Sequence, residues 1–360
     1  MNNIKIVQSN KSWIESNAIE SLKKMANLKG IIKAVGLPDL HLGKTPVGAS
    51  YLTKDIIYPH IIGNDIGCGM SLFSTGIRKR KIKVHRLLKK LEKTEEVHIE
   101  EFKNIDLPFR EKLGTIGSGN HFGELTEIDR VYDENLLKEN NIDKNNVFLL
   151  IHSGSRSYGE HILRDFIDKH SCERGIEVNS PLFKEYMDEH NRAMEFATIN
   201  REVIAYKMNK ALGSKENRKL LDSVHNSITP KKIYGQMYYI HRKGAAPSDV
   251  GLVVVAGSRG SSSYIVRPRL NLVDYNYSIS HGAGRKWSRS GCKERLKNIY
   301  SKKDLRENRI SSNLIYKDVN SIYEEAPEAY KNIERVIKDM VDANMIDIVA
   351  TLKPLITYKV

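Results

Sequence analysis

Cysteine, histidine and aspartate recur in glycine-containing segments of this 360-residue sequence. Asp65 and Cys68 stand three residues apart in the run DIGC, and His121, His152 and His225 follow in separate segments. A set that mixes carboxylate, thiolate and imidazole suits a borderline divalent ion such as Zn²⁺ or Mn²⁺. The spacing is not that of a zinc finger, and a cysteine taken alone is more often a small buried residue than a ligand. The residue types therefore indicate a metal centre only if the fold brings them together.

A second chemical possibility is a nucleophile in the run SHGAGR. His281 stands there among small residues, four positions before Arg285. A neutral imidazole can attack phosphorus, and an arginine can neutralise the charge that develops. The competing interpretation is that His281 only forms a hydrogen bond within a tight glycine-rich loop. Cys68 is an alternative nucleophile, although no histidine adjacent to it in the sequence forms an obvious dyad.

The sequence lacks the familiar nucleotide-binding motifs. The run Gly43–Thr45 resembles the end of a phosphate-binding loop, but the required earlier glycine is replaced by Pro38. Neither Gly67–Gly69 nor Gly117–Gly119 continues to the third glycine of a dinucleotide fingerprint. The Lys-x-Asp-Gly signature of nucleotidyl transferases is also missing. A bound nucleotide would therefore need another kind of site.

One arrangement recurs along the chain and would gather these side chains. A short apolar segment leads into a loop of Gly and Ser that carries His, Cys or Arg. Loops after buried strands are where folds place binding and catalytic groups, and glycine lets backbone N–H groups approach an anion closely. We therefore expect one shared site rather than several. The segments are Tyr58–Met70, Gly114–Glu124, Val147–Tyr158, Val250–Tyr264 and Tyr275–Arg289.

Apolar periodicity predicts helices between stretches of strand and loop. Helical spacing of apolar residues, or a long run without Pro and Gly, marks four segments, and Pro327 suits the start of the last. The predicted helices are Trp13–Leu28, Arg78–Lys93, Leu182–Leu212 and Ala329–Met340. Short apolar runs bounded by Gly and Pro are typical of strands. The predicted strand regions are Ile31–Thr75, Ile346–Leu352 and Leu355–Val360.

The composition excludes several classes of protein. The hydrophobic fraction of 40% and the charged fraction of 28% are typical of globular chains. The longest apolar stretch, near Val250–Ala256, is far shorter than a membrane span, and Met1–Lys11 lacks the apolar region of a secretory signal. Three cysteines are too few for a disulfide framework. We therefore expect a soluble, cytoplasmic protein with no membrane partner.

The excess positive charge is concentrated in two segments. The net charge is +14, and the segment Arg78–Lys90 contributes +8 because it holds eight basic residues and no acidic one. The segment Arg285–Arg309 contributes +7, from ten basic and three acidic residues. The rest of the chain is nearly neutral. Concentrated basic segments suggest a polyanion such as nucleic acid as partner, although such segments can also be plain solvated surfaces.

Nine short motifs together resemble those of one enzyme family. They are, in chain order, PDLHLGK, GNDIGCGM, GSGNHFGE, HSGSRS, VHN, HRKGAA, GSRGSSSY, SHGAGR and EEAPEAY. This combination, from about Pro38 to the C-terminus, closely resembles the RtcB family of GTP-dependent RNA ligases. The resemblance implies an α+β fold in which residues 1–360 form a single RtcB-like ligase domain, with a β-rich core flanked by helices and one active-site cleft. It also implies joining of RNA 3′-phosphate or 2′,3′-cyclic phosphate ends to 5′-hydroxyl ends, with GTP and two Mn²⁺ ions.

The resemblance further implies roles for individual residues. His281 would be the catalytic nucleophile that becomes guanylylated, Glu124 would read the guanine edge, and Cys68 would bridge the two Mn²⁺ ions. The implied metal ligands are Asp65, Cys68, His121, His152 and His225. The residues implied to lie around the nucleotide are Asn120, Glu124, Asn226, Lys243, Ser258, Ser262, Ser263, Ala283, Arg285 and Lys359.

Two departures from the family pattern bear on the substrate. The chain is short for the family, and Ser157 and Tyr158 follow the HSGSR run where many members have a small, Gly-containing run. These features are nearest to the shorter branch that often accompanies a release-factor-like protein. That branch is expected to repair cleaved ribosomal RNA, whereas longer relatives mend tRNA.

Two other functions compete with RNA ligation. One is a metal-dependent RNA phosphoesterase or cyclic phosphodiesterase that kept the metal site and lost guanylylation. Glu124, His281 and Arg285 argue against it, because hydrolysis needs no guanine reader. The other is a non-catalytic RNA-binding protein, which only the charge supports and which would need no cysteine–histidine cluster.

Overall fold

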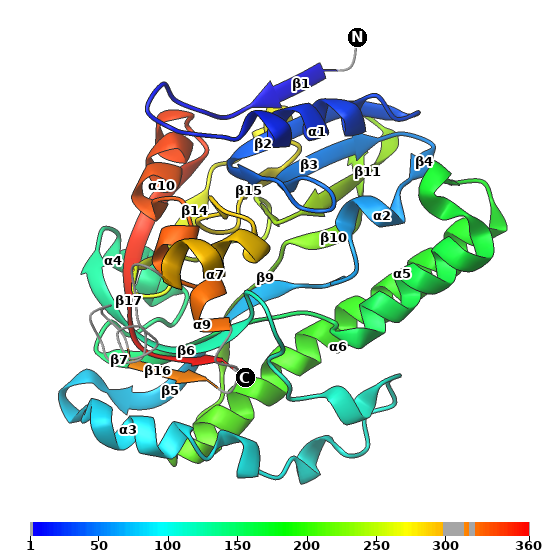
Figure 1. The fold of residues 1–360 in the computed structure, drawn as a ribbon. Coiled ribbons are helices and arrows are strands. Elements are labelled where there is room, and N and C mark those ends of the chain that lie inside the picture. The colour runs from blue at the N-terminus through cyan, green and yellow to red at the C-terminus, as the bar shows by residue number, and fades with distance from the viewer. Residues whose placement is uncertain (1–2, 298–312, 317–320, 360) are drawn as a thin grey trace.

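Two β-sheets form the centre of the computed structural model, and helices lie around them (Figure 1). The structure describes residues 3–297, 313–316 and 321–359. The strands are β1 (Asn3–Ile6), β2 (Ile31–His41), β3 (Val47–Thr53), β4 (Ile56–Ile57), β5 (Gly69–Arg78), β6 (Phe122–Val131), β7 (Asn146–Ser153), β8 (Ile176–Glu177), β9 (Lys219–Val224), β10 (Asn226–Ile233), β11 (Gln236–Lys243), β12 (Ala245–Pro247), β13 (Val253–Val255), β14 (Ser263–Pro268), β15 (Ser278–Ser280), β16 (Asn313–Tyr316) and β17 (Ile346–Lys359).

The strand order separates the two sheets and leaves two short ribbons. The first sheet has the order β1-β2-β3-β11-β10. The second has the order β13-β14-β17-β6-β7-β5-β9, with β16 paired to β17. The ribbons pair β12 with β15 and β4 with β8. Together with the helices, these sheets confirm the expected α+β class with a β-rich core.

The helices confirm most of the periodicity predictions. The long predicted helix 182–212 is present as α6, whose start is set by Pro181 and by the Ser180 side chain, which accepts from the Leu182 N–H. The helices are α1 (Ser16–Ala26), α2 (Pro59–Ile62), α3 (Val84–Leu91), α4 (Glu134–Glu139), α5 (Ser157–His170), α6 (Pro181–Leu212), α7 (Arg289–Lys297), α9 (Ser321–Glu324) and α10 (Ile333–Asp342).

Helices cover the sheets by burying an apolar stripe. On α1, Ala18, Leu22 and Ala26 are fully buried against strands β2 and β3. On α10, Val336 and Met340 join the core between β2, β13, β14 and β15. Helices α3 and α6 bury their apolar faces against β5, β6, β7 and β17. These helices do not cover the strand ends that lie between the two sheets, and those ends carry the candidate site.

Two predictions near the C-terminus were wrong in detail. Pro327 does not start the predicted helix: it opens a short 3₁₀ turn, Pro327–Ala329, and α10 begins later, after the capping side chain of Asn332. The two predicted C-terminal strands are one strand, β17, up to Lys359. Irregular pairing with β6 at Ala350/Leu352 and at Pro354/Ile356 carries the strand through the proline that suggested a break.

Helix α6 braces the loops that carry the candidate site. The guanidinium of Arg201 is fully buried and donates to the carbonyls of Gly67 at 2.9 Å and Ser153 at 3.1 Å. The Asn200 amide accepts from the Gly114 N–H at 2.8 Å and donates to the Ser153 hydroxyl at 3.1 Å. Two adjacent helical residues thus fix three of the glycine-containing loops relative to one another.

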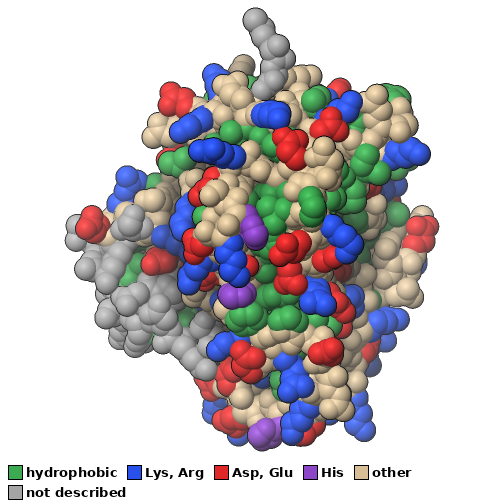
Figure 2. Space-filling model, turned by 90° about the vertical axis from the view of Figure 1, so that its right-hand side faces the viewer, with side chains coloured by type: hydrophobic (Ala, Val, Ile, Leu, Met, Phe, Trp, Pro, Cys, Tyr) green, Lys and Arg blue, Asp and Glu red, His purple; other side chains and the backbone are tan. Residues whose placement is uncertain are grey.

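The two basic segments differ in how much of each is described. Arg78–Lys90 runs from the end of β5 into α3, with Leu87 buried and the basic side chains outside or half-buried. Of Arg285–Arg309, only the part up to Lys297 lies within the described residues. On the face shown in Figure 2, basic and acidic side chains are intermixed. Within the described parts of the chain, no helix is both long and apolar enough to cross a membrane.

Candidate active site

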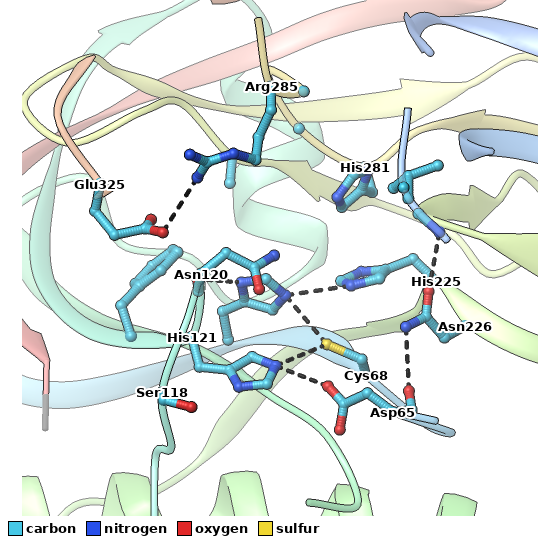
Figure 3. Close-up of a pocket in the computed structure, with 18 of the residues that line it drawn as sticks. Asp65, Cys68, Ser118, Asn120, His121, His225, Asn226, His281, Arg285 and Glu325 are labelled. Carbon is cyan, nitrogen blue, oxygen red and sulfur yellow. Dashed lines mark hydrogen bonds and ion pairs between the residues drawn. The ribbon is translucent and has the colours of Figure 1, made fainter. Parts of the chain in front are cut away.

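A cavity of about 750 Å³ lies where loops from the two sheets meet. Every one of the five Gly- and Ser-containing segments contributes to its wall, for example through Cys68, His121, His152, Ser258 and His281. Figure 3 shows Cys68, His121 and His281 reaching into the cavity from different strands and loops. The prediction that the five segments share one site is therefore confirmed.

Strand register in the second sheet brings the predicted metal ligands together. Cys68 immediately precedes β5, whose first residue pairs with Ser153 of β7 on one side and Val224 of β9 on the other. His152 and His225 adjoin those two partners in the sequence. The His225 N–H also donates to the Cys68 carbonyl at 2.8 Å. Residues far apart in the chain thus become neighbours through ordinary antiparallel pairing.

Two sets of donor atoms share the sulfur of Cys68 (Figure 3). Its Sγ lies 3.2 Å from Nε2 of His152 and 3.3 Å from Nε2 of His121. The Nε2 atom of His225 lies 3.2 Å from that of His152, and Oδ2 of Asp65 lies 2.7 Å from Nε2 of His121. The sets Cys68–His152–His225 and Asp65–Cys68–His121 each keep their ligand atoms within 4.8 Å.

The protonation preferences of this cluster fit a bound cation. Burial lowers the pKa of His152 and of His225 well below the ordinary value, and neighbouring imidazoles lower it further, so both rings are neutral. Burial, followed by the Asp65 carboxylate, raises the pKa of the Cys68 thiol well above its ordinary value. A metal ion relieves this arrangement because it replaces the thiol proton and binds the imidazole lone pairs. The donor set therefore fits a bound metal ion, which either of the two groups that contain Cys68 could hold.

Neighbouring groups hold the ligands in orientation. Nδ1 of His152 lies 3.0 Å from the carbonyl of Asn120, so the ring donates there and turns its Nε2 lone pair toward the cluster. Gly154 makes room for the carboxylate, because a Cβ atom at this position would lie 2.4 Å from Oδ1 of Asp65. The Asp65 backbone carbonyl accepts from the Asn226 amide at 3.1 Å.

His281 lies beside the metal cluster and is backed by a buried carboxylate. Its ring centroid is 4.6 Å from that of His225. Its Nδ1 lies 2.7 Å from Oδ2 of Asp39, a residue of β2 with no exposed surface. Although burial raises the pKa of Asp39, the hydrogen bond and charge of His281 outweigh it and hold the pKa below its ordinary value. Asp39 is therefore ionised, and the free ring nitrogen of His281 is Nε2.

A second part of the cavity lies around Glu325, which Figure 3 shows away from His281. We call this part, together with the lining residues Tyr330, Thr357 and Lys359, the Glu325 end. The Lys359 ammonium lies 3.1 Å from Oε2 of Glu325 and donates to the Gly119 carbonyl at 2.7 Å. The hydroxyl of Thr357 donates to the buried Glu124 carboxylate at 2.9 Å. Because Thr357 and Lys359 are two apart on β17, they present their side chains to the same face.

Arg285 lines the cavity, but protein acceptors already occupy its donors. Nε donates to the Trp287 carbonyl, Nη1 to Glu325 and to the Tyr330 hydroxyl, and Nη2 to Cys292 Sγ and the Glu324 carbonyl. A guanidinium has five N–H groups, and all five have partners here. In this arrangement Arg285 holds the wall of the Glu325 end in place, and its expected position close to the nucleotide stays a prediction.

The remaining predicted residues divide between the wall and the loops behind it. Residues Asn120, Asn226, Lys243, Ser258 and Ala283 all line the cavity. Ser262 and Ser263 do not line it. The Ser263 hydroxyl instead accepts from the Gly257 N–H at 3.1 Å and shapes the loop before β14. Their expected contact with a nucleotide stays a prediction.

Three functional candidates were not singled out from the sequence. Asp39 holds His281, Glu325 pairs with Lys359 and Arg285, and Nη1 of Arg156 lies 2.7 Å from Nδ1 of His121. Each stands in one of the quoted motifs, PDLHLGK, EEAPEAY and HSGSRS. A carboxylate within the apolar run before His41 was the signal for Asp39, because such a position is buried and needs a partner.

Glu124→Gln is expected to stabilise the folded chain at pH 8. Burial raises the pKa of Glu124 to about 7, above the ordinary value of 4.5. The unfolded chain then loses this proton first, so the free energy of unfolding falls as the pH rises from 4.5 through 7. Above pH 7 the raised pKa of Glu124 lowers the free energy of unfolding by about 3 kcal/mol. Glutamine has no charge and avoids this cost, and its side-chain oxygen still accepts from Thr357.

Urea unfolding of both proteins at pH 4.5 and pH 8 checks this. The stabilisation should appear at pH 8 and vanish near pH 4.5. Glu127→Gln, on the same strand, is the matched control and should show no such gain. An equal gain for Glu124→Gln at both pH values would contradict the assignment of a strained, buried carboxylate.

A histidine held by a buried carboxylate beside metal-binding donors is suited to metal-dependent phosphoryl transfer. Comparison with known proteins identifies the class more closely. The sequence model of the family described as "tRNA-splicing ligase RtcB" matches residues 21–110 and 107–360. The chain therefore belongs to the RtcB family, and it is an RNA ligase.

Curated relatives are similar over nearly the whole chain. RNA-splicing ligase RtcB2 of an Escherichia coli strain is 41% identical over 364 residues, which cover 98% of this chain and 94% of the relative. RNA-splicing ligase RtcB of Escherichia coli K12 is 26% identical, with 96% and 95% covered. The tRNA-splicing ligase RtcB of Nanoarchaeum equitans is 26% identical, with 96% and 92% covered.

Proposed function

We propose that this ligase joins an RNA 3′-phosphate end to a 5′-hydroxyl end through a GMP–histidine intermediate on His281, with GTP and two Mn²⁺ ions. The observation that carries the proposal is the position of His281. Its ring lies against His225 of the donor cluster, and Asp39 occupies its Nδ1 atom. The proposed nucleophile and the donors proposed to bind metal ions thus line one cavity, which supports the proposal.

In the first step, Nε2 of His281 attacks the α-phosphorus of GTP. The N–P bond forms as the bond between the α-phosphorus and the bridging oxygen breaks, and pyrophosphate leaves. The ring gains positive charge while it still holds its Nδ1 proton. Asp39, ionised and 2.7 Å away, stabilises that charge and fixes the ring orientation. Splitting the joining reaction in this way is the ordinary advantage of covalent catalysis.

In the second stage, the RNA 3′-phosphate takes GMP from His281, and the 5′-hydroxyl then displaces GMP. One oxygen of the 3′-phosphate attacks the GMP phosphorus, and His281 departs as the neutral ring. The 5′-hydroxyl attacks the activated 3′-phosphate, and GMP leaves with the electron pair. A 2′,3′-cyclic end would first need water to open it to a 3′-phosphate.

The residues that would hold the metal ions are Asp65, Cys68, His121, His152 and His225. Bound there, Mn²⁺ would supply positive charge to the phosphoryl oxygens. Mn²⁺ fits a mixed set of carboxylate and imidazole donors. The chain itself positions these donors through the strand register and the brace from α6.

The buried carboxylate of Glu124 supports recognition of guanine. An ionised carboxylate accepts from the two adjacent N–H groups on the guanine edge, whereas adenine would leave it unpaired. Asn120, Asn226, Lys243, Ser258, Ala283 and Lys359 also line the cavity. We propose these side chains, with Glu124, as the surroundings of the nucleotide.

The RNA would approach over basic side chains at the rim. Lys286 and Arg289 are exposed, and Arg289 lines the cavity mouth beside Asn120. Such side chains bind the backbone without reading its sequence. On the resemblance, we propose cleaved ribosomal RNA or tRNA as the substrate and a release-factor-like protein as a partner, in the cytoplasm.

A joining assay tests the proposal. Two RNA halves, one ending in 3′-phosphate and one beginning with 5′-hydroxyl, are incubated with the protein, Mn²⁺ and GTP. A joined product that requires GTP is expected. Loss of the end phosphate, or opening of a cyclic phosphate, without joining would favour the phosphoesterase alternative. Binding of RNA without any change in its ends would favour the non-catalytic alternative.

A further inference from the structure

A lysine outside the cavity joins the segment that carries Asp39 to the segment that carries His281. Lys331 lies just before α10 and does not line the cavity. Its ammonium donates to the carbonyl of Leu40 at 2.6 Å and to that of Pro38 at 3.1 Å, the residues on either side of Asp39. Both acceptors belong to the backbone, so the ammonium holds the chain at Asp39 and leaves the carboxylate to face His281.

Strand pairing does not hold this part of β2. The regular pairing of β2 with β3 stops at Gly36 and resumes at His41. Opposite the four residues between them, β3 supplies Gly48 alone, and the pairing of β2 with β1 also ends at Gly36. Extra residues in a bulged strand are left out of the ladder. The position of Asp39 therefore depends on contacts from outside the sheet.

The backbone of the same lysine is bonded to the loop that begins with His281. The N–H of Lys331 donates to the Gly284 carbonyl at 3.0 Å. Gly284 has a φ of 71°, and a Cβ atom at this position would lie 2.4 Å from the carbonyl oxygen of Asp39. The loop and the β2 segment thus meet backbone to backbone, and Lys331 is hydrogen-bonded to both.

The surroundings of the ammonium make its two hydrogen bonds strong. Burial lowers the pKa of Lys331 to about 8, and the carboxylate of Asp39 is foremost among the charges that oppose this lowering. The polar contacts of the ammonium within the described chain are the two carbonyls. Hydrogen bonds from a charged donor gain strength where water is excluded. Lys331 is therefore an effective link between the two segments.

Resting on the proposed function, we infer that Lys331 is a positioning residue for the transfer of GMP to His281. By bonding to the chain on both sides of Asp39 and to the loop that begins with His281, it fixes the carboxylate relative to the ring. The hydrogen bond of 2.7 Å between Asp39 and Nδ1 of His281 then holds Nε2 in one direction. Lys331 acts through Asp39 and not on the nucleotide, because it lies outside the cavity wall.

The expected consequence is confined to the step that uses His281. Attack on phosphorus requires the ring nitrogen in line with the leaving pyrophosphate, and a misplacement of about 1 Å can slow a reaction by about 100-fold. Sealing of RNA that already carries an activated 3′-guanylyl end needs only the metal site. That reaction should therefore be insensitive to Lys331.

Lys331→Met tests this inference through the rate of GMP labelling, measured with Mn²⁺ at a series of concentrations of α-labelled GTP. Methionine keeps the apolar stem and removes the N–H donors. The maximal rate should fall about 10- to 100-fold, and the GTP concentration that gives half the maximal rate should stay the same. Sealing of the activated RNA should match the parent protein. Lys331→Gln keeps an amide donor, should show the same pattern to a smaller extent, and carries the test if the methionine variant does not fold.

A double substitution shows whether Lys331 acts through Asp39. Residues that act as a unit have non-additive effects on the rate. Asp39→Asn already removes the charge that Lys331 positions, so adding Lys331→Met should slow labelling by less than about threefold more. Losses that multiply in the double variant would show that Lys331 acts independently of Asp39 and would contradict the inference.

Lys338→Met is the matched control, because it removes an exposed lysine that pairs with Asp342 on α10. It should label and seal like the parent protein. Equal losses of labelling and sealing in Lys331→Met would show a general structural role, and a change in half-saturating GTP alone would place Lys331 at the nucleotide. Either result, or unchanged labelling, would overturn the inference. A parent protein that forms no GMP adduct would instead refute the proposed function.

Discussion

Replacing His281 with alanine is expected to abolish transfer of GMP to the protein. The variant lacks the nitrogen that would attack the α-phosphorus of GTP. Loss of a covalent nucleophile lowers rates by more than about 1000-fold. Denaturing electrophoresis after incubation with Mn²⁺ and α-labelled GTP measures the adduct directly. Joining of a 3′-phosphate end should be lost with it.

Two further variants sharpen this prediction. His98→Ala removes an exposed histidine outside the cavity and should label like the parent protein. Asp39→Asn keeps the side-chain shape and removes the charge, so labelling should slow by about 10²- to 10⁴-fold, as for a comparable carboxylate–histidine pair.

Sealing of RNA that already carries an activated 3′-guanylyl end should survive in His281→Ala, because this step needs only the metal site. The adduct of the parent protein should be acid-labile and alkali-stable, as a phosphoramidate is. Robust labelling of His281→Ala, or an adduct mapped by mass spectrometry to Cys68 or a lysine, would refute the assignment.

Replacing Cys68 with alanine is expected to remove most of the stabilisation that Mn²⁺ confers. A ligand that binds only the folded state stabilises it by mass action, by about 2.7 kcal/mol at a hundredfold excess over Kd. Both donor sets include the Cys68 sulfur, so one substitution impairs both. The measurement is the shift in melting temperature between chelator and Mn²⁺, for the parent protein and the variant.

Cys172→Ala provides the matched control for this experiment. Cys172 is also fully buried, but it packs in the core beside Phe166 and Tyr186, outside the cavity. The Cys172→Ala variant should have a lower melting temperature because the buried sulfur is lost. It should still show the whole rise in melting temperature that Mn²⁺ causes. A Cys68→Ala protein that keeps the full shift, or that joins RNA at the normal rate, would exclude the shared-ligand arrangement.

The sequence by itself determined which residue types are available for chemistry. Those in the glycine-rich loops made Cys68 and His152 candidate metal donors and His281 a candidate nucleophile, beside ordinary structural roles. A long run without Pro or Gly located helix α6, because helix formation depends on residues a few positions apart. Order and content of the motifs indicated the family. These are all local properties of the chain.

Tertiary structure alone decided which residues meet and what each can do. The contact of Cys68 with His152 and His225 depends on the register of β5 between β7 and β9. That register is set by pairing and packing across the whole sheet and not by neighbouring residues.

Contacts between segments remote in the sequence also explain which residues the sequence analysis missed. Arg285 was expected to lie close to the nucleotide, and only the structure shows that Trp287, Glu324, Glu325 and Cys292 already occupy its donors. Asp39 looked like part of an apolar strand, yet it backs His281. Whether a polar side chain is satisfied depends on contacts between segments remote in the sequence, so only the folded chain could show that the donors of Arg285 are occupied.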